Sequence, residues 1–175
     1  VGQLVKLCES FALPVTIPMS NLYLNFPTDH PMHLGFDPMK FLPNADVILV
    51  IEADVPWFPI RAKPKPEAKV IQLGIDPFFS RYPMRSFPAD VPLACDPEAG
   101  LKALREALEA QRSENKRTIQ ERYERLSREH NAQRAGWKAA GERLKGERPI
   151  DMEYVSYCVG QVREADTILI NEYDL

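Results

Sequence analysis

The chain has 175 residues, a net charge of −3 and 27% charged residues. This length allows one domain with a hydrophobic core and part of a second, and the ordinary charge balance gives no reason to expect a nucleic-acid or membrane partner. No apolar run approaches the roughly 20 residues that span a bilayer. Cys8, Cys95 and Cys158 are far apart and form no CxxC pair, which is typical of reduced thiols in a cytoplasmic protein.

The first predicted element is a helix over residues 1–12. Pro14 ends it, and the segment PVTIP that follows predicts a short strand. A loop, NFPTDHPMHLGFDP, then runs from Asn25 to Pro38. The apolar face of the helix has helical spacing and consists of Val1, Leu4, Val5, Cys8, Phe11 and Ala12.

Three further segments predict strands, at residues 46–52, 69–74 and 91–97. The first is an unbroken apolar run rich in β-branched residues, a pattern typical of a strand buried on both faces of a parallel sheet. Residues 54–66 are rich in proline and exclude regular structure. Strands separated by helix-compatible segments and short links predict an α/β domain with a parallel sheet.

An Asp-Pro pair recurs after apolar residues, at Asp37-Pro38, Asp76-Pro77 and Asp96-Pro97. Asp can accept a hydrogen bond from a free backbone N–H of a first helical turn, and Pro lacks the N–H that would be left unpaired there. Each pair therefore predicts the start of a helix. The last of these helices has a stripe of leucines and ends near residue 111, so we place the first domain at residues 1–111.

Residues 112–148 are dense in Arg, Lys and Glu. Ile119, Tyr123 and Leu126 have helical spacing, which predicts a long, largely exposed helix. A nucleic-acid-binding arm is the alternative, but acids are interleaved and few aromatics are present to stack on bases. We therefore predict a charged helical linker and no nucleic-acid partner.

The pattern of an α/β domain resumes in residues 149–175. Asp151 can cap a helix with apolar positions at Met152, Val155 and Val159, and residues 166–172 predict another buried strand. One helix and one strand do not make a core, so we expect the start of a further domain that is truncated here. The chain as a whole is expected to be part of a longer polypeptide.

Five segments in order, FALPV, FPTDHPMHLGFDP, ADVILVIEADVPW, AKVIQLGIDP and PADVPLACDP, resemble the central domain of thiamine diphosphate-dependent enzymes of the acetolactate synthase type. The resemblance covers about residues 1–110. It implies a three-layer, Rossmann-like (DHS-like NAD/FAD-binding) domain with a six-stranded parallel sheet flanked by helices, followed by a helical linker. The full enzyme would act on 2-oxo acids by carboligation or decarboxylation, as a homo-oligomer.

The same resemblance implies that this chain is a scaffold and is not catalytic by itself. The activating glutamate of such enzymes belongs to an N-terminal domain, and the Mg²⁺-binding GDG motif to a C-terminal domain; this sequence contains no GDG. Thiamine diphosphate and Mg²⁺ would therefore be held by the flanking domains, which are the expected partners. In the full enzyme, Asn171 and Glu172 would lie near thiamine diphosphate, at the end of the last predicted strand.

Some central domains of this type bind FAD or an adenine nucleotide. The matching positions here are Leu34, Gly35, Glu52, Ala53, Asp54 and Asp76. Leu34, Gly35 and Asp76 agree with the family pattern, but Glu52 stands in place of a glycine and Asp54 in place of an arginine. Two carboxylates disfavour a pyrophosphate, and no GxGxxG motif is present, so we expect an empty, structural domain, with a nucleotide-binding module as the alternative.

Other residues allow a functional and a structural interpretation. His30 and His33, with Asp29 and Asp37 nearby, have the side chains of a zinc site, but three prolines stiffen this stretch, so we expect a shaped loop and no metal.

Trp57 and Phe58 lie in the proline-rich loop, where they would line a pocket or contact another domain, and we expect the contact. Arg81, Tyr82 and Arg85 would bind a phosphate or form salt bridges to neighbouring domains, and we expect the salt bridges. No catalytic residue is expected, since Cys8 and Cys158 fall on or beside apolar helix faces.

Overall fold

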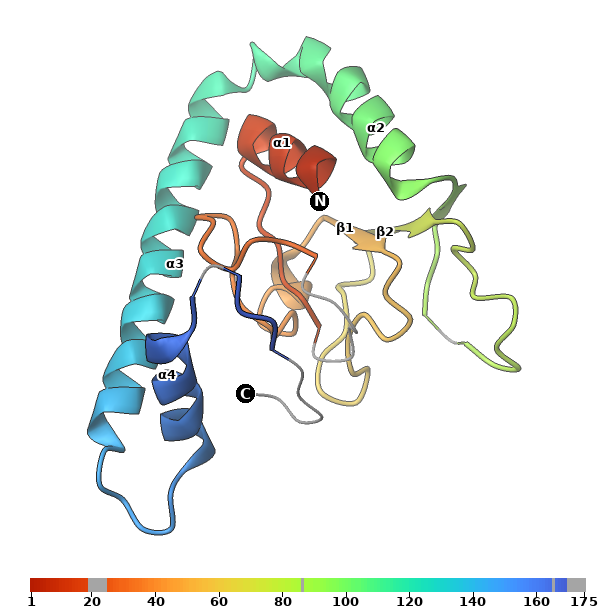
Figure 1. The fold of residues 1–175 in the computed structure, drawn as a ribbon. Coiled ribbons are helices and arrows are strands. Elements are labelled where there is room, and N and C mark those ends of the chain that lie inside the picture. Colours follow the sequence, from red (N-terminus) through yellow and green to blue (C-terminus); the bar gives the residue numbers. More distant parts are fainter. Residues whose placement is uncertain (19–24, 86, 165, 170–175) are drawn as a thin grey trace. The chain divides into compact units, whose positions relative to one another are not determined.

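The computed structural model describes residues 1–18, 25–85, 87–164 and 166–169. They belong to two compact units, Val1–Ser127 and Arg128–Leu175. The first unit is α/β and contains a three-stranded parallel sheet flanked by helices, as predicted (Figure 1).

The first helix, α1 (Gly2–Phe11), confirms the predicted amphipathic helix, and its buried residues include Leu7 and Cys8. It ends at Ala12, whose φ of 49° is left-handed, two residues before Pro14. The predicted strand PVTIP is reduced to one parallel bridge between Val15 and His33. The Val15 N–H donates to the carbonyl of Met32, and the Leu34 N–H donates to the carbonyl of Val15, both at 2.8 Å.

The sheet consists of β1 (Val47–Ile51), β2 (Lys69–Gly74) and β3 (Val91–Ala94), in that order. All three predicted strands are confirmed, and both pairs are parallel. The expectation of strands buried on both faces holds for the central strand β2, but in β1 only Val50 is fully buried and all of β3 is exposed. The described residues form three strands, whereas the resemblance implies six.

Both faces of the sheet carry apolar clusters. On one face, Leu49 and Ile51 of β1 pack in a cluster with residues of α1 and of α2 (Pro97–Arg112). On the other face, Val50 of β1 and Val70 of β2 are buried with Trp57. The side chains of β1 thus alternate between two covered faces, as its unbroken apolar run requires.

One of the three predicted Asp-Pro helix starts is confirmed. The Asp96 carboxylate accepts a hydrogen bond of 3.0 Å from the Ala99 N–H and caps α2. The other two predictions are wrong: Asp37 precedes a turn and the short 3₁₀ helix η1 (Leu42–Asn44), and Asp76 precedes a turn only. A further proline follows each of these pairs, Pro43 and Pro83, and it stops the helix before two turns can form.

We expect Asp96→Ala to lower the free energy of unfolding by about 0.5–2 kcal/mol, because the Ala99 N–H loses its only capping acceptor. Urea unfolding followed by circular dichroism measures this change. Asp96→Asn is the matched control, since it keeps an acceptor oxygen, and we expect it to retain most of the stability. Equal losses in the two variants would contradict a capping role.

A long third helix, α3 (Lys116–Arg143), follows a turn at residues 113–115 and confirms the predicted charged helix. Most of it is exposed. Its first part nevertheless enters the core of the first unit, where Leu126 is 1% exposed and Ile119 and Tyr123 pack around it. The predicted domain boundaries after residues 111 and 148 remain predictions.

In the second unit, α4 (Met152–Val162) begins as predicted at Asp151, whose carboxylate accepts from the Glu153 N–H at 2.8 Å. A Cβ built on Gly141 of α3 would lie 2.5 Å from the side chain of Tyr157, so a glycine is required at this close approach. The last predicted strand covers residues 166–172. Its described part, 166–169, has no strand geometry, and the rest lies outside the described residues.

Candidate functional site

The strongest candidate for a ligand site is the carboxyl edge of the sheet, where open parallel sheets bind ligands. Glu52 follows β1 with a left-handed φ of 47°. Its side chain lies across the end of β2, because its Oε1 accepts a hydrogen bond from the Ile75 N–H at 3.1 Å. A Cβ on Gly74 would be 2.8 Å from Glu52 Cγ, so Gly74 makes room for this carboxylate. Glu52 thus closes the space between the two strand ends.

Asp54 continues this edge and is held from two sides. The Tyr82 hydroxyl donates to its Oδ2 at 3.1 Å, and the hydrogen bond to this carboxylate raises the pKa of Tyr82 above its ordinary value. The Val55 N–H donates to its Oδ1 at 2.8 Å. The Asp54 carboxylate is therefore already engaged within the chain.

Arg85 lies near Asp54 and Asp76, and it is used within the chain. Its Nη2 donates to the carbonyl of Ala53 at 3.1 Å, and its Nε to the carbonyl of Asp54 at 3.3 Å. The guanidinium also stacks over the ring of Phe79 at 4.4 Å. Burial lowers the pKa of Arg85. Within the chain, Arg85 clamps the residues that follow β1, and the salt bridges to neighbouring domains stay a prediction.

Asp76 completes the edge after β2. Its carboxylate accepts hydrogen bonds from both the Ser80 N–H at 2.7 Å and the Ser80 hydroxyl at 2.8 Å. The hydrogen bond from the Ser80 side chain is the main reason that the pKa of Asp76 is lowered. Glu52, Ala53 and Asp54 follow β1 and Asp76 follows β2, so all four lie at the carboxyl edge of the sheet, and their part in binding a nucleotide stays a prediction.

Leu34 and Gly35 occupy a different setting. Both are buried, and Leu34 belongs to a core cluster with Cys8 and Phe26. Gly35 has a φ of 89°, a value that favours glycine, and its carbonyl accepts from the Ile17 N–H at 3.1 Å. Asn171 and Glu172 lie outside the described residues.

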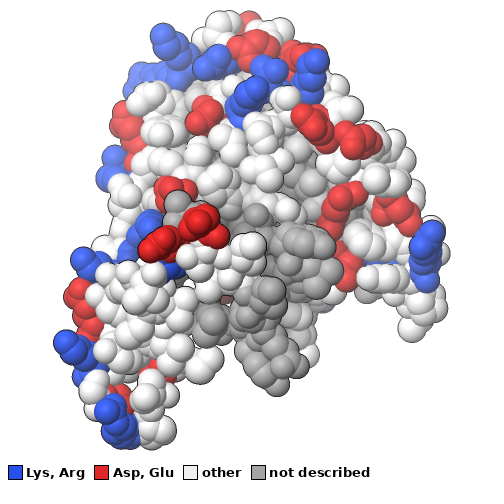
Figure 2. All heavy atoms as spheres, in the orientation of Figure 1, with Lys and Arg blue, Asp and Glu red and all other residues white. Residues whose placement is uncertain are grey.

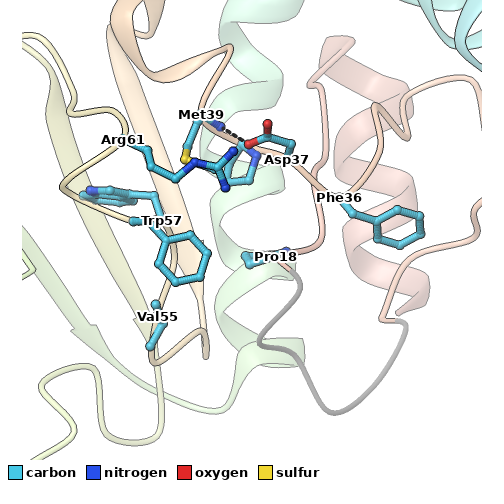
Figure 3. Close-up of a pocket in the computed structure, with 9 residues that line it drawn as sticks. Pro18, Phe36, Asp37, Met39, Val55, Trp57 and Arg61 are labelled. Carbon is cyan, nitrogen blue, oxygen red and sulfur yellow. Dashed lines mark hydrogen bonds between the residues drawn. The ribbon is translucent and has the colours of Figure 1, made fainter. Parts of the chain in front are cut away.

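The loops that follow Gly35 and Asp54 meet around a small pocket of about 130 Å³ (Figure 3). Its walls are mostly apolar, and Asp37 and Arg61 are its charged residues. The Asp37 Oδ1 already accepts from the Met39 N–H at 3.0 Å. Met39 and Arg61 were not singled out by sequence reasoning. The proline-rich stretch directly after β1 was the available signal, because a loop at that position lies at the ligand-binding edge.

The described residues do not fit FAD or a dinucleotide. Pockets for ligands of that kind have volumes of about 300–1,000 Å³, whereas this one has about 130 Å³. A pyrophosphate needs cations or free N–H groups, and the edge offers three engaged carboxylates. The Ile75 N–H, which points to this edge, is taken by Glu52.

The two histidines of the loop at residues 25–38 have structural roles. The His30 Nδ1 accepts from the Met32 N–H at 3.1 Å, and its Nε2 lies 3.5 Å from Glu9 Oε1. His33 is fully buried, with its ring 5.3 Å from that of Phe36. Within the described ranges no three His, Cys, Asp or Glu side chains are placed to hold a metal ion.

Trp57 corrects a prediction, because it does not reach out toward another domain. It is 3% exposed and lies in the core cluster beside β1, with its ring edge-on to Phe87 at 5.3 Å. Phe58, the next residue, is 44% exposed. The buried side chain of Trp57 forms part of the wall of the pocket.

Cys8 gives a prediction about reactivity. Its burial, and secondarily the charge of Glu9, raise the pKa of this thiol to about 12, so its thiolate is roughly a thousandfold rarer than that of an ordinary cysteine at neutral pH. We expect Cys95 and Cys158 to react with a thiol reagent at pH 8 in the folded chain, while Cys8 reacts only after unfolding.

The same pKa shift has a consequence for stability. Above pH 9 the thiol of Cys8 loses its proton in the unfolded chain and keeps it in the folded chain, so the free energy of unfolding should fall as the pH rises from there.

Counting reacted thiols with and without guanidinium tests the predicted reactivity of the three cysteines. Three fast-reacting thiols in the folded chain would contradict it.

On the face shown in Figure 2, basic side chains (blue) and acidic side chains (red) are interspersed. They form no broad basic surface on that face. Ion pairs within the helices account for part of this pattern, including Arg112–Glu109 at 3.0 Å and Arg117–Glu121 at 2.7 Å. No helix in the described part of the chain has the length and apolar character needed to cross a bilayer.

Comparison of the chain with models of protein families, with curated proteins and with solved structures finds no match.

Proposed function

We propose that residues 1–148 are the central scaffold domain and helical linker of a thiamine diphosphate-dependent enzyme of the acetolactate synthase type. Residues 149–175 would begin its C-terminal domain. The full enzyme would join or decarboxylate 2-oxo acids, with thiamine diphosphate and Mg²⁺ held by the flanking domains and supplying the carbanion chemistry. Support comes from the order of the five resembling segments and from a parallel sheet flanked by helices.

One observation favours a scaffold over a cofactor-binding module. At the carboxyl edge of the sheet, Glu52, Asp54 and Asp76 use their carboxylates to hold backbone and side-chain groups of the same chain. Arg85 donates to backbone carbonyls there. Because these groups are already hydrogen-bonded within the chain, the edge has few free donors with which to bind an anion.

We infer the finer fold to be a three-layer, Rossmann-like domain of the DHS-like type, which forms homo-oligomers in the full-length enzyme. The free thiols of Cys8, Cys95 and Cys158 support a reducing, cytoplasmic setting. The alternative, an FAD- or adenine-nucleotide-binding module, draws its support from the pocket beside Phe36 and Trp57, whose small volume weakens it.

A thermal-shift titration with FAD, ADP and coenzyme A separates the two interpretations. We expect no change in Tm with any of them, since binding to the folded state alone would raise it. A rise in Tm that grows with FAD or ADP concentration would favour the nucleotide-binding module instead.

The gene around this chain tests the family assignment. We expect its reading frame to encode a glutamate-bearing domain upstream and a GDG motif downstream. The encoded full-length protein should consume pyruvate or another 2-oxo acid only with thiamine diphosphate and Mg²⁺, while the 175-residue chain alone should not. Stop codons that directly flank the present sequence would contradict the proposal.

A further inference from the structure

The small pocket between the loops that follow Gly35 and Asp54 has no part in the proposed scaffold. It has a volume of about 130 Å³, and the buried Trp57 forms part of its wall (Figure 3). Apolar cavities of about 150 Å³ hold a benzene ring, so this pocket has room for an apolar group of about four or five carbon atoms. Its apolar lining consists of Pro18, Phe36, Pro38, Met39, Val55, Trp57 and Phe58.

Hydrogen bonds within each loop give the pocket its shape. In the first loop, the Phe41 N–H donates to the carbonyl of Pro38 at 3.0 Å. In the second, the Arg61 N–H donates to the carbonyl of Phe58 at 2.9 Å. Pro38 and Pro56 also fix their own φ angles. The walls are therefore formed before a ligand arrives, which lowers the entropy cost of binding.

Two opposite charges line the pocket, one from each loop. Asp37 and Arg61 are both exposed, so they lie toward its open side, whereas Trp57 is buried. In the described part of the chain, the Arg61 guanidinium takes part in no ion pair or hydrogen bond. The Asp37 carboxylate accepts the Met39 N–H at Oδ1 and has lone pairs for further donors. A cation and an anion are thus both available at one apolar pocket.

We propose that this pocket binds an α-amino acid with an apolar side chain. The side chain fills the apolar space beside Trp57, the α-carboxylate accepts hydrogen bonds from the Arg61 guanidinium, and the α-ammonium donates to the Asp37 carboxylate. A simple carboxylic acid would be repelled by Asp37 and a simple amine by Arg61, whereas a zwitterion is attracted by both.

The proposal does not depend on the proposed function. FAD, ADP and coenzyme A are too large for this volume, so their expected lack of effect on Tm leaves the pocket untested. The exposed charges contribute modestly to affinity, because water and salt screen them. Burial of the apolar side chain contributes more, and we expect a Kd of about 0.1–1 mM.

Titration of the isotope-labelled 175-residue chain with L-leucine, followed by NMR, tests the site. Leucine has a side chain that matches the volume. We expect saturable shifts in the amide signals of Met39 and Val55 and in the indole signal of Trp57. Absence of a saturable shift at about 10 mM L-leucine, or shifts confined to other parts of the chain, would overturn the proposal.

Three analogues separate the parts of the ligand. Isocaproate lacks the ammonium of leucine and isoamylamine lacks its carboxylate, so each should bind at least about tenfold more weakly. L-Serine keeps both charges and lacks the apolar group, and it should bind more weakly still. Binding of isocaproate or isoamylamine as tight as that of leucine would overturn recognition of a zwitterion. Equally tight binding of serine would overturn the use of the apolar pocket.

Variants assign the two charges. Arg61→Gln and Asp37→Asn should each weaken L-leucine binding about tenfold, and Asn keeps an oxygen that accepts the Met39 N–H. Both residues are exposed, so the Tm of each variant should stay close to that of the wild-type chain. Arg81→Gln is the matched control, because Arg81 is an exposed arginine that does not line the pocket, and it should bind leucine like the wild-type chain. Equal affinities of the three variants would overturn the proposal.

Discussion

Replacing Trp57 with alanine should lower the free energy of unfolding by about 3–5 kcal/mol. The indole is 3% exposed and packs among Leu42, Val50 and Val70 in the cluster that covers one face of the sheet. Its removal would leave a cavity that the neighbouring proline-rich loop is too stiff to fill. Urea unfolding monitored by far-UV circular dichroism measures the loss.

Phe58→Ala is the matched control for this substitution. Phe58 is the next residue of the same loop and has a similar aromatic side chain, but it is 44% exposed. We expect its replacement to cost less than about 1 kcal/mol. If Trp57 instead served a partner, as the sequence suggested, both substitutions would leave the stability of the isolated chain almost unchanged.

The sequence predicted the strands because their signal is local. Residues 69–74 follow a proline-rich stretch, are mostly apolar and end at Gly74, and the predicted strand agrees with β2 residue for residue. The same signal does not report the position of a strand within a sheet. An apolar run indicates two covered faces, which β1 has, and it does not report which strands pair with it; among the described residues β1 pairs with β2 alone.

Four of the residues singled out for the candidate site lie at one edge of the sheet, whereas Leu34 and Gly35 do not, and the hydrogen bonds that hold the four were not predicted. Glu52, Ala53, Asp54 and Asp76 do share the carboxyl edge, because parallel strands end on the same side. The partners of residues 53 and 54 come from far along the chain, because Tyr82 and Arg85 reach back to them. Such pairings depend on how the irregular loop after β2 folds, and neither periodicity nor composition determines that.

The same limit explains the Asp-Pro pairs. All three carry the residues that start a helix, and all three Asp side chains accept backbone hydrogen bonds as a cap would. Only Asp96 is followed by a long segment without proline. Capping therefore selects where a helix can begin, while the next dozen residues decide whether it continues.

Replacing Leu126 with alanine should lower the free energy of unfolding by about 2–5 kcal/mol, although this residue lies in a helix that is dense in charge. Leu126 is 1% exposed and belongs to the core cluster that contains Cys8 and Leu34. One turn earlier, the Arg122 Nη2 donates to the carbonyl of Phe11 at 2.7 Å, so α3 also satisfies a backbone group at the end of α1. Chemical unfolding of the full chain measures the effect.

Two comparisons make the Leu126 result decisive. Leu126→Met preserves most of the side-chain volume and should cost less than about 1.5 kcal/mol. Trp137→Ala removes a larger side chain further along the same helix, where the indole is 44% exposed, and should cost less than Leu126→Ala. A solvated linker predicts small and equal effects at both positions. The unequal effects expected here would show that the first half of α3 is part of the fold of the α/β unit, so removing the charged segment at residue 112 would expose the core around Leu126.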